Sequence, residues 1–223
     1  MRSWQALSAA LLFCVALLVR AQLTGATTQS FVLKPVSTLL VIAISLIGAG
    51  DGRPGMDAYR RLVVAGLVFS LAGDVFLMLP GDRFVAGLAA FLVAHLCYLG
   101  AFTRDEGFTT SNATALPLAA AGVTLLALLW PTLGPMRLPV LAYVAAILAM
   151  AWQALERSRL ATHEGAGWAA VGAVLFVASD ASLGIDRFLT PFPAAPAVVL
   201  GTYYFAQWMI ATSVLVRDGV LAT

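Results

Sequence analysis

Three ionisable residues, Asp74, His95 and Asp180, each lie inside a separate apolar stretch that is suited to the interior of a lipid bilayer. A charged side chain at the centre of a bilayer costs about 2.5–3.5 kcal/mol even on the most lenient scale. Such side chains are therefore expected where they pair with one another, line a cavity or perform a function. We take these three residues as the candidate catalytic groups.

Two carboxyl groups in one low-dielectric chamber can divide the work of acid–base catalysis. Burial disfavours the ionised form of a carboxyl group, and a second carboxylate nearby disfavours it further. One of Asp74 and Asp180 could stay protonated as a general acid while the other is ionised. Such a pair suits bonds whose cleavage passes through an oxocarbenium ion, as in glycosides. Enol ethers also qualify, because protonation at carbon gives the cation and water then adds, oriented here by His95 or Tyr204.

The composition is that of an integral membrane protein. Of 223 residues, 61% are hydrophobic and 11% are charged, and the mean hydropathy is +0.92. Soluble domains average about 45–50% apolar and about 25% charged residues. We therefore expect a single integral-membrane domain over residues 1–223. The 13 basic residues are scattered through short loops and the net charge is +2, so a nucleic-acid partner is not indicated.

The apolar stretches predict an all-α polytopic membrane protein with about eight transmembrane helices, since one crossing takes about 20 apolar residues. All ten prolines lie in loops or near the ends of stretches, which supports the boundaries. Lys34-Pro35 is read as the start of the second helix, with a snorkelling lysine. The predicted helices are residues 4–19, 31–49, 62–79, 85–102, 113–130, 138–155, 166–185 and 197–216.

The first stretch has an alternative reading. An apolar run followed by Val19-Arg20-Ala21 resembles a signal peptide with its cleavage site. We expect the helix to be retained, because Arg20 directly after the run also suits a helix that stays in the membrane. The alternative is a mature protein of seven helices.

The distribution of basic residues predicts that both termini are cytoplasmic. In that orientation the outer side carries Arg20, Lys34, Arg83, Arg137 and Arg187. The inner side carries the other eight basic residues, which are Arg2, Arg53, Arg60, Arg61, Arg104, Arg157, Arg159 and Arg217.

In this orientation the polar groups of several helices share one layer. At 1.5 Å per residue, the two aspartates lie roughly 8–15 Å below the outer boundary. The same layer holds Tyr204 and Gln207, while Lys34 is expected at the outer mouth and His95 deeper. We therefore expect one polar chamber that opens outward.

Aromatic residues share helical faces with the ionisable ones. Phe91 and Tyr98 lie within four residues of His95, and Phe176 lies four residues before Asp180. Spacings of three and four put these side chains on common faces. They could line a slot for an alkyl chain, although such stripes also serve packing alone.

Two similar segments follow the two aspartates. Asp82-Arg83-Phe84 follows Asp74, and Asp186-Arg187-Phe188 follows Asp180. This echo is compatible with a parallel internal repeat and also with chance similarity.

A metal centre is a weaker alternative. Asp74, His95 and Asp180 could together bind a divalent ion. The other histidine, His163, lies in a predicted cytoplasmic loop, so one chain cannot supply three histidines for a zinc site. We expect no metal and no other cofactor. The chain has no Gly-x-Ser-x-Gly motif, which disfavours a serine esterase.

Several short motifs follow one another along the chain. They are Lys34-Pro35, Gly73-Asp74-Val-Phe76-Leu77-Met78-Leu79, Phe84-x-x-Gly87, Phe91-x-x-x-His95-x-x-Tyr98, Gly172-Ala173-x-Leu-Phe176-x-x-Ser179-Asp180 and Tyr204-x-Ala206-Gln207. In their order and spacing, the sequence resembles the YhhN family of membrane lysoplasmalogenases from about residue 31 to 216.

The resemblance implies an eight-helix enzyme that hydrolyses the vinyl ether of lysoplasmalogens to a fatty aldehyde and glycerophosphoethanolamine or glycerophosphocholine. Asp74 and Asp180 would form the acid–base pair. The residues around them would be Lys34, His95, Tyr98, Tyr204 and Gln207. Lys34 could receive the phosphate, and Phe91 and Phe176 the alkyl chain.

Two other functions use the same residues. Buried Asp and His side chains also build proton relays, so a proton-coupled transporter is one alternative. A non-catalytic lipid-binding membrane protein is another. The richness in Ala, Leu and Arg suggests a bacterial chain, and we expect it in the inner (cytoplasmic) membrane with a lysophospholipid substrate.

Overall fold

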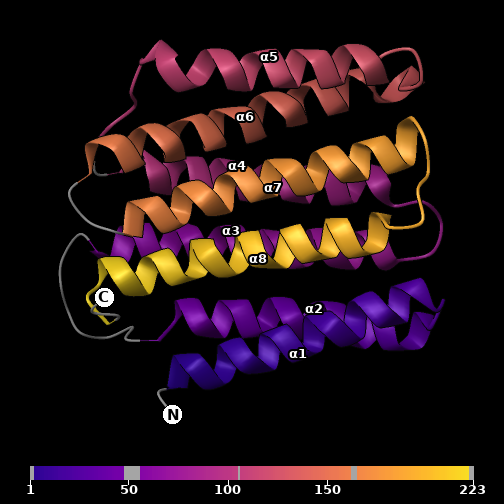
Figure 1. The fold of residues 1–223 in the computed structure, drawn as a ribbon, viewed down its shortest axis with the longest axis horizontal. Helices are drawn as coiled ribbons and strands as arrows, with labels where there is room; N and C mark the ends of the chain where they lie inside the picture. Colours follow the sequence, from indigo (N-terminus) through magenta and orange to yellow (C-terminus); the bar gives the residue numbers. More distant parts are fainter. Residues whose placement is uncertain (1–2, 48–55, 105, 162–164, 221–223) are drawn as a thin grey trace.

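A computed structural model describes residues 3–47, 56–104, 106–161 and 165–220. Within these residues, eight α-helices form an up-and-down bundle, with a 3₁₀-helix at Gly134–Met136 (Figure 1). The helices are α1 (Ser3–Leu23), α2 (Thr27–Ser45), α3 (Met56–Met78), α4 (Phe84–Phe102), α5 (Asn112–Leu129), α6 (Arg137–Leu160), α7 (Gly165–Phe188) and α8 (Ala195–Arg217).

The predicted all-α membrane fold is confirmed, and the described residues contain no strand. Seven of the helices are long and apolar enough to cross a membrane. The remaining helix, α5, is apolar but shorter, with 18 residues that span about 27 Å at 1.5 Å per residue. At one end of the bundle, each odd-numbered helix ends and the next, even-numbered helix begins. We call this the far end. α1 begins and α8 ends at the opposite end (Figure 1).

The predicted start of the second helix was wrong because Pro35 does not mark it. α2 begins at Thr27, so Pro35 lies inside the helix and Lys34 lies about two turns from its start. Pro117 likewise lies inside α5. Proline removes one backbone donor, and each helix continues past its proline, α2 to Ser45 and α5 to Leu129.

Other helices extend past the apolar stretches that predicted them. α3 begins six residues earlier than expected, at Met56, and α6 continues to Leu160. Glu156 and Arg157 in the last turns of α6 are buried because they have polar partners, Thr114 and Tyr59. Residues 48 and 49 of the predicted second helix lie outside the described residues, as do Arg2, Arg53 and His163.

The helices are arranged so that two hairpins enclose the centre. The α3–α4 and α7–α8 pairs each pack closely, α6 bridges α4 and α7, and α2 bridges α3 and α8. α1 and α5 lie at opposite outer sides of the bundle (Figure 1). A side chain at Gly172 would place its Cβ 2.9 Å from the Ala206 carbonyl oxygen. A glycine is therefore required where α7 meets α8, as small residues are at many membrane helix contacts.

Candidate functional site

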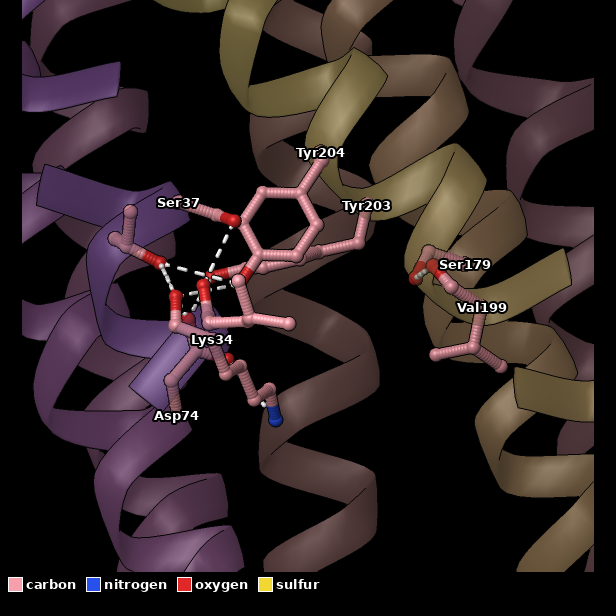
Figure 2. A network of polar contacts seen from close by, with 9 residues as sticks. Lys34, Ser37, Asp74, Ser179, Val199, Tyr203 and Tyr204 are labelled. Atoms are coloured by element: carbon pink, nitrogen blue, oxygen red, sulfur yellow. Dashed lines mark hydrogen bonds and ion pairs between the residues drawn. The ribbon is translucent and has the colours of Figure 1, made fainter. Parts of the chain in front are cut away.

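Asp74, on α3, accepts three polar contacts from two other helices. Its Oδ1 lies 3.2 Å from the Lys34 ammonium nitrogen, and its Oδ2 accepts hydrogen bonds from the Thr38 and Tyr203 hydroxyls, each at 2.8 Å. The Asp74 side chain is 1% exposed. Figure 2 shows Lys34 and Tyr203 converging on this carboxyl group. A buried carboxylate is stable only when it is paired and hydrogen-bonded in this way, so the surroundings suit the ionised form.

The contacts to Asp74 depend on how α2 packs against α3 and α8. Lys34 and Thr38 are four residues apart and therefore lie on one face of α2. Tyr204 donates a hydrogen bond of 2.9 Å to the backbone carbonyl of Lys34, which ties α8 to α2 at this point. The neighbouring Tyr203 points instead toward Asp74 (Figure 2). Lys34 thus lies inside the bundle, paired with Asp74, and not at the outer mouth as expected.

Asp180, on α7, has a different environment. The Tyr143 hydroxyl donates a hydrogen bond of 2.5 Å to its Oδ2, and the side chain is 16% exposed. His95 Nε2 lies 3.9 Å from the same oxygen, which is too long for a hydrogen bond. Asp180 therefore has a strong neutral donor, and within the described residues it has no contact with Lys or Arg.

His95 lies next to Asp180 and is surrounded by aromatic side chains. Its ring contacts Tyr143 and Phe176 edge to face, with centroid distances of 5.1 and 4.7 Å. The side chain is fully buried, and both ring nitrogens lack a hydrogen-bond partner within the described part of the chain. A buried polar group without a partner is costly, so its position beside Asp180 calls for a functional explanation.

One cavity of about 290 Å³ connects the two aspartates. Its polar lining is Lys34, Asp74, Tyr143, Ser179, Asp180 and Tyr203. The rest is an apolar slot between α4, α5, α6 and α7, and it includes Phe91, Leu118, Leu125, Val144, Ile147 and Leu148. Such a space, mostly apolar with a few polar groups, is typical of a small-molecule site and suits a single alkyl chain.

The remaining predicted site residues lie outside this lining. Phe176 is fully buried in the aromatic cluster, where it packs against Phe91 and Tyr203. The Tyr98 hydroxyl donates to Gln207 Oε1 at 2.8 Å, and both residues are buried in the bundle core. Among the described residues, the cavity lining therefore includes none of Tyr98, Phe176 and Gln207.

Three residues that contact the aspartates were not among the predicted site residues. Tyr203 was passed over for its neighbour Tyr204, because adjacent residues on a helix differ by about 100° and the apolar pattern could not distinguish them. Thr38 lies four residues after Lys34, which was expected at the outer mouth, and Tyr143 lies in a stretch that has no Asp, Glu, His, Lys or Arg. The usable signal was a hydroxyl group inside an apolar stretch, since buried hydroxyls are expected to have partners.

The three residues considered as metal ligands do not form one ligand set. Asp74 faces an ammonium group and two hydroxyl donors. His95 and Asp180 are neighbours, but no group of three His, Cys, Asp or Glu residues with suitable geometry occurs in the described ranges. The arrangement is that of two separate carboxyl sites on one cavity.

The chain matches known proteins over most of its length. A family model described as the YhhN family matches residues 29–214. "Lysoplasmalogenase TMEM86A" of Homo sapiens is 38% identical over 159 residues, which cover 68% of this chain and 64% of that protein. "Lysoplasmalogenase" of Mycobacterium tuberculosis (strain CDC 1551 / Oshkosh) is 36% identical over 177 residues, covering 76% and 66%.

"Uncharacterized membrane protein YhhN" of Escherichia coli O157:H7 is 31% identical over 196 residues, covering 87% of this chain and 91% of that protein. The chain spans 64% and 66% of the length of the two lysoplasmalogenases above. No solved structure matches it.

Proposed function

The chain belongs to the YhhN family, and we propose that it is a membrane lysoplasmalogenase. It would hydrolyse the vinyl ether of alkenyl lysophospholipids to a fatty aldehyde and glycerophosphoethanolamine or glycerophosphocholine. The names of the human and mycobacterial relatives support this activity. The observation that carries the proposal is one apolar cavity bordered by two aspartates in unlike surroundings.

The two carboxyl groups would have different protonation states. Asp74 has an ammonium group and two hydroxyl donors, all of which stabilise a carboxylate. Asp180 is bordered by apolar and aromatic side chains and receives one hydroxyl donor. We therefore assign Asp180 as the general acid and Asp74 as the ionised partner. Lys34 then serves to keep Asp74 charged.

Hydrolysis would proceed through an oxocarbenium ion. Asp180 transfers its proton to the vinyl carbon that is farther from the ether oxygen, and positive charge develops on the carbon bonded to that oxygen. The Asp74 carboxylate stabilises this cation and accepts a proton from the water that adds to it. The hemiacetal then breaks its bond to the glycerol oxygen, its hydroxyl proton passes to that oxygen, and the aldehyde forms. The proton on Asp74 returns to Asp180 through solvent.

Two residues would hold the acid in place. Tyr143 donates to Asp180 Oδ2, which leaves Oδ1 to carry the proton. His95 lies behind Asp180 and does not border the cavity, so we assign it a positioning role and not direct contact with the substrate. Phe91 would contact the substrate chain, because it lines the slot.

The substrate would enter at the far end of the bundle. Most of the residues that line the cavity come from the far-end halves of α3, α4, α5, α6, α7 and α8, together with Lys34 of α2. With both termini cytoplasmic, this end faces the outer leaflet of the inner membrane. Single-chain lysolipids in that leaflet would present their headgroups at the same level.

The test is turnover of defined lipids by the purified protein. We expect aldehyde release from 1-alkenyl lysophosphatidylethanolamine or lysophosphatidylcholine and none from the matching alkyl ether, which has no double bond to protonate. Asp180→Asn should lower turnover by about 10²–10⁴-fold, as expected for loss of a general acid. Glu106→Gln, which changes an exposed loop carboxylate, is the matched control. Full activity in folded Asp180→Asn and Asp74→Asn proteins would contradict the assigned roles.

A further inference from the structure

The two Asp-Arg-Phe segments of the sequence meet at the rim of the cavity. Phe84 begins α4 and Phe188 ends α7, and their rings pack edge to face with a centroid distance of 5.5 Å. Both rings line the cavity. The Arg187 guanidinium carbon lies 4.0 Å above the centre of the Phe84 ring. Residues from both segments thus frame the far end of the slot.

Arg187 is held across this rim by the other segment. One terminal nitrogen donates to both carboxylate oxygens of Asp82, at 2.9 and 3.2 Å. The side chains are 39% and 74% exposed, respectively. An exposed pair of this kind contributes little to stability, so another anion can replace Asp82 at small cost. The aromatic ring below keeps the guanidinium at the rim.

We propose that Arg187 binds the phosphate of the substrate headgroup, with the Asp82 carboxylate occupying the same donors when no lipid is bound. Guanidinium groups bind phosphate oxygens in the same bidentate way as carboxylate oxygens. The inference rests on the proposed function and names the residue that would recognise the phosphodiester. It replaces the expectation that Lys34 receives the phosphate, since that ammonium group is engaged by Asp74 inside the bundle.

The spacing along α7 fits such a substrate. Arg187 follows Asp180 by seven residues, which is nearly two turns, so the two side chains share one face of α7. The axial separation is about 10 Å at 1.5 Å per residue. Seven bonds join the vinyl carbon that Asp180 protonates to phosphorus, and an extended chain covers about 8 Å over seven bonds. The flexible arginine side chain spans the remainder.

The experiment measures binding of two uncleavable lipids to the full-length protein in detergent. The ligands are 1-alkyl lysophosphatidylethanolamine, which carries the phosphodiester, and 1-alkylglycerol, which lacks it. Arg187→Gln should raise the Kd of the first at least about tenfold, the size expected for loss of a charge-assisted bond, and leave the second unchanged. Arg187→Lys should give an intermediate value. Arg83→Gln, an exposed arginine of the other segment, should change neither.

A second variant separates binding from a structural role of the ion pair. Asp82→Asn frees the guanidinium, so it should lower the Kd of the phospholipid, the opposite direction to Arg187→Gln. If both variants weaken both ligands alike, or if Arg187→Gln leaves the phospholipid Kd unchanged, the inference is wrong. A loss shared by the two ligands would instead indicate a structural role of the ion pair at the rim. Because the ligands are uncleavable, this result is independent of whether the protein hydrolyses vinyl ethers.

Discussion

Replacing Lys34 by methionine is expected to destabilise the protein through Asp74. Methionine keeps an unbranched chain of similar length but has no ammonium group. The Asp74 carboxylate, 1% exposed, would then retain only the Thr38 and Tyr203 hydroxyls. Breaking a buried ion pair by removing one partner costs about 3–5 kcal/mol. The two remaining donors and the 12% exposure of Lys34 favour the lower end, about 3 kcal/mol.

The double variant Lys34→Met/Asp74→Asn provides the critical comparison. An amide at position 74 carries no charge, so the loss of the ammonium group should then cost little. We expect a coupling energy of about 2–3 kcal/mol between the two positions, at the upper end of the range for contacting residues. If the two single effects on the free energy of unfolding add, the pair is not the stabilising contact that we infer.

The assay is reversible unfolding in mixed micelles with increasing denaturing detergent, followed by tryptophan fluorescence. Arg83→Met is the matched control, because it removes an exposed cation at the far end. Its effect should stay within about 0.5 kcal/mol. Turnover should be lost in every variant that changes Lys34 or Asp74, including the restabilised double variant.

Three further substitutions test other parts of the site. Tyr143→Phe removes the donor to Asp180, and we expect kcat to fall by about 10- to 100-fold, whereas unchanged kcat would show that the hydroxyl is not needed. Val144→Trp fills the apolar slot, so long alkenyl chains should lose turnover while short chains keep it; equal effects on all lengths would place the chain elsewhere. Gly172→Leu forces a side chain against Ile210, with a Cβ contact of 2.8 Å, and should cost about 1–3 kcal/mol in unfolding free energy, which denaturing-detergent titration measures.

The sequence was sufficient to predict the membrane fold and its two main polar groups. Apolar stretches of nearly transmembrane length predict the helices directly, because the bilayer requires them. Asp74 and Asp180 were identifiable because a carboxyl group in such a stretch is costly. Both aspartates lie in the far-end halves of their helices, α3 and α7, and both border one cavity.

The detailed contacts of the site could not be predicted from the sequence. The pairing of Lys34 with Asp74 depends on α2 starting at Thr27, and Pro35 concealed that start. The preference for Tyr203 over Tyr204 at Asp74 depends on a rotation of α8 of about 100°, which two adjacent aromatic residues leave open. These are matters of helix register and rotation, and tertiary packing decides them.

The most direct test of the central claim is turnover of alkenyl lysophosphatidylethanolamine in D₂O, with the aldehyde trapped at once and analysed by mass spectrometry. Protonation at carbon by an acid in exchange with solvent predicts one deuterium on the carbon next to the carbonyl group. The folded Asp180→Asn protein should release almost none of this product. Aldehyde without deuterium from the wild-type protein, or equal amounts of deuterated aldehyde from the wild-type and Asp180→Asn proteins, would contradict the claim that Asp180 protonates the vinyl ether.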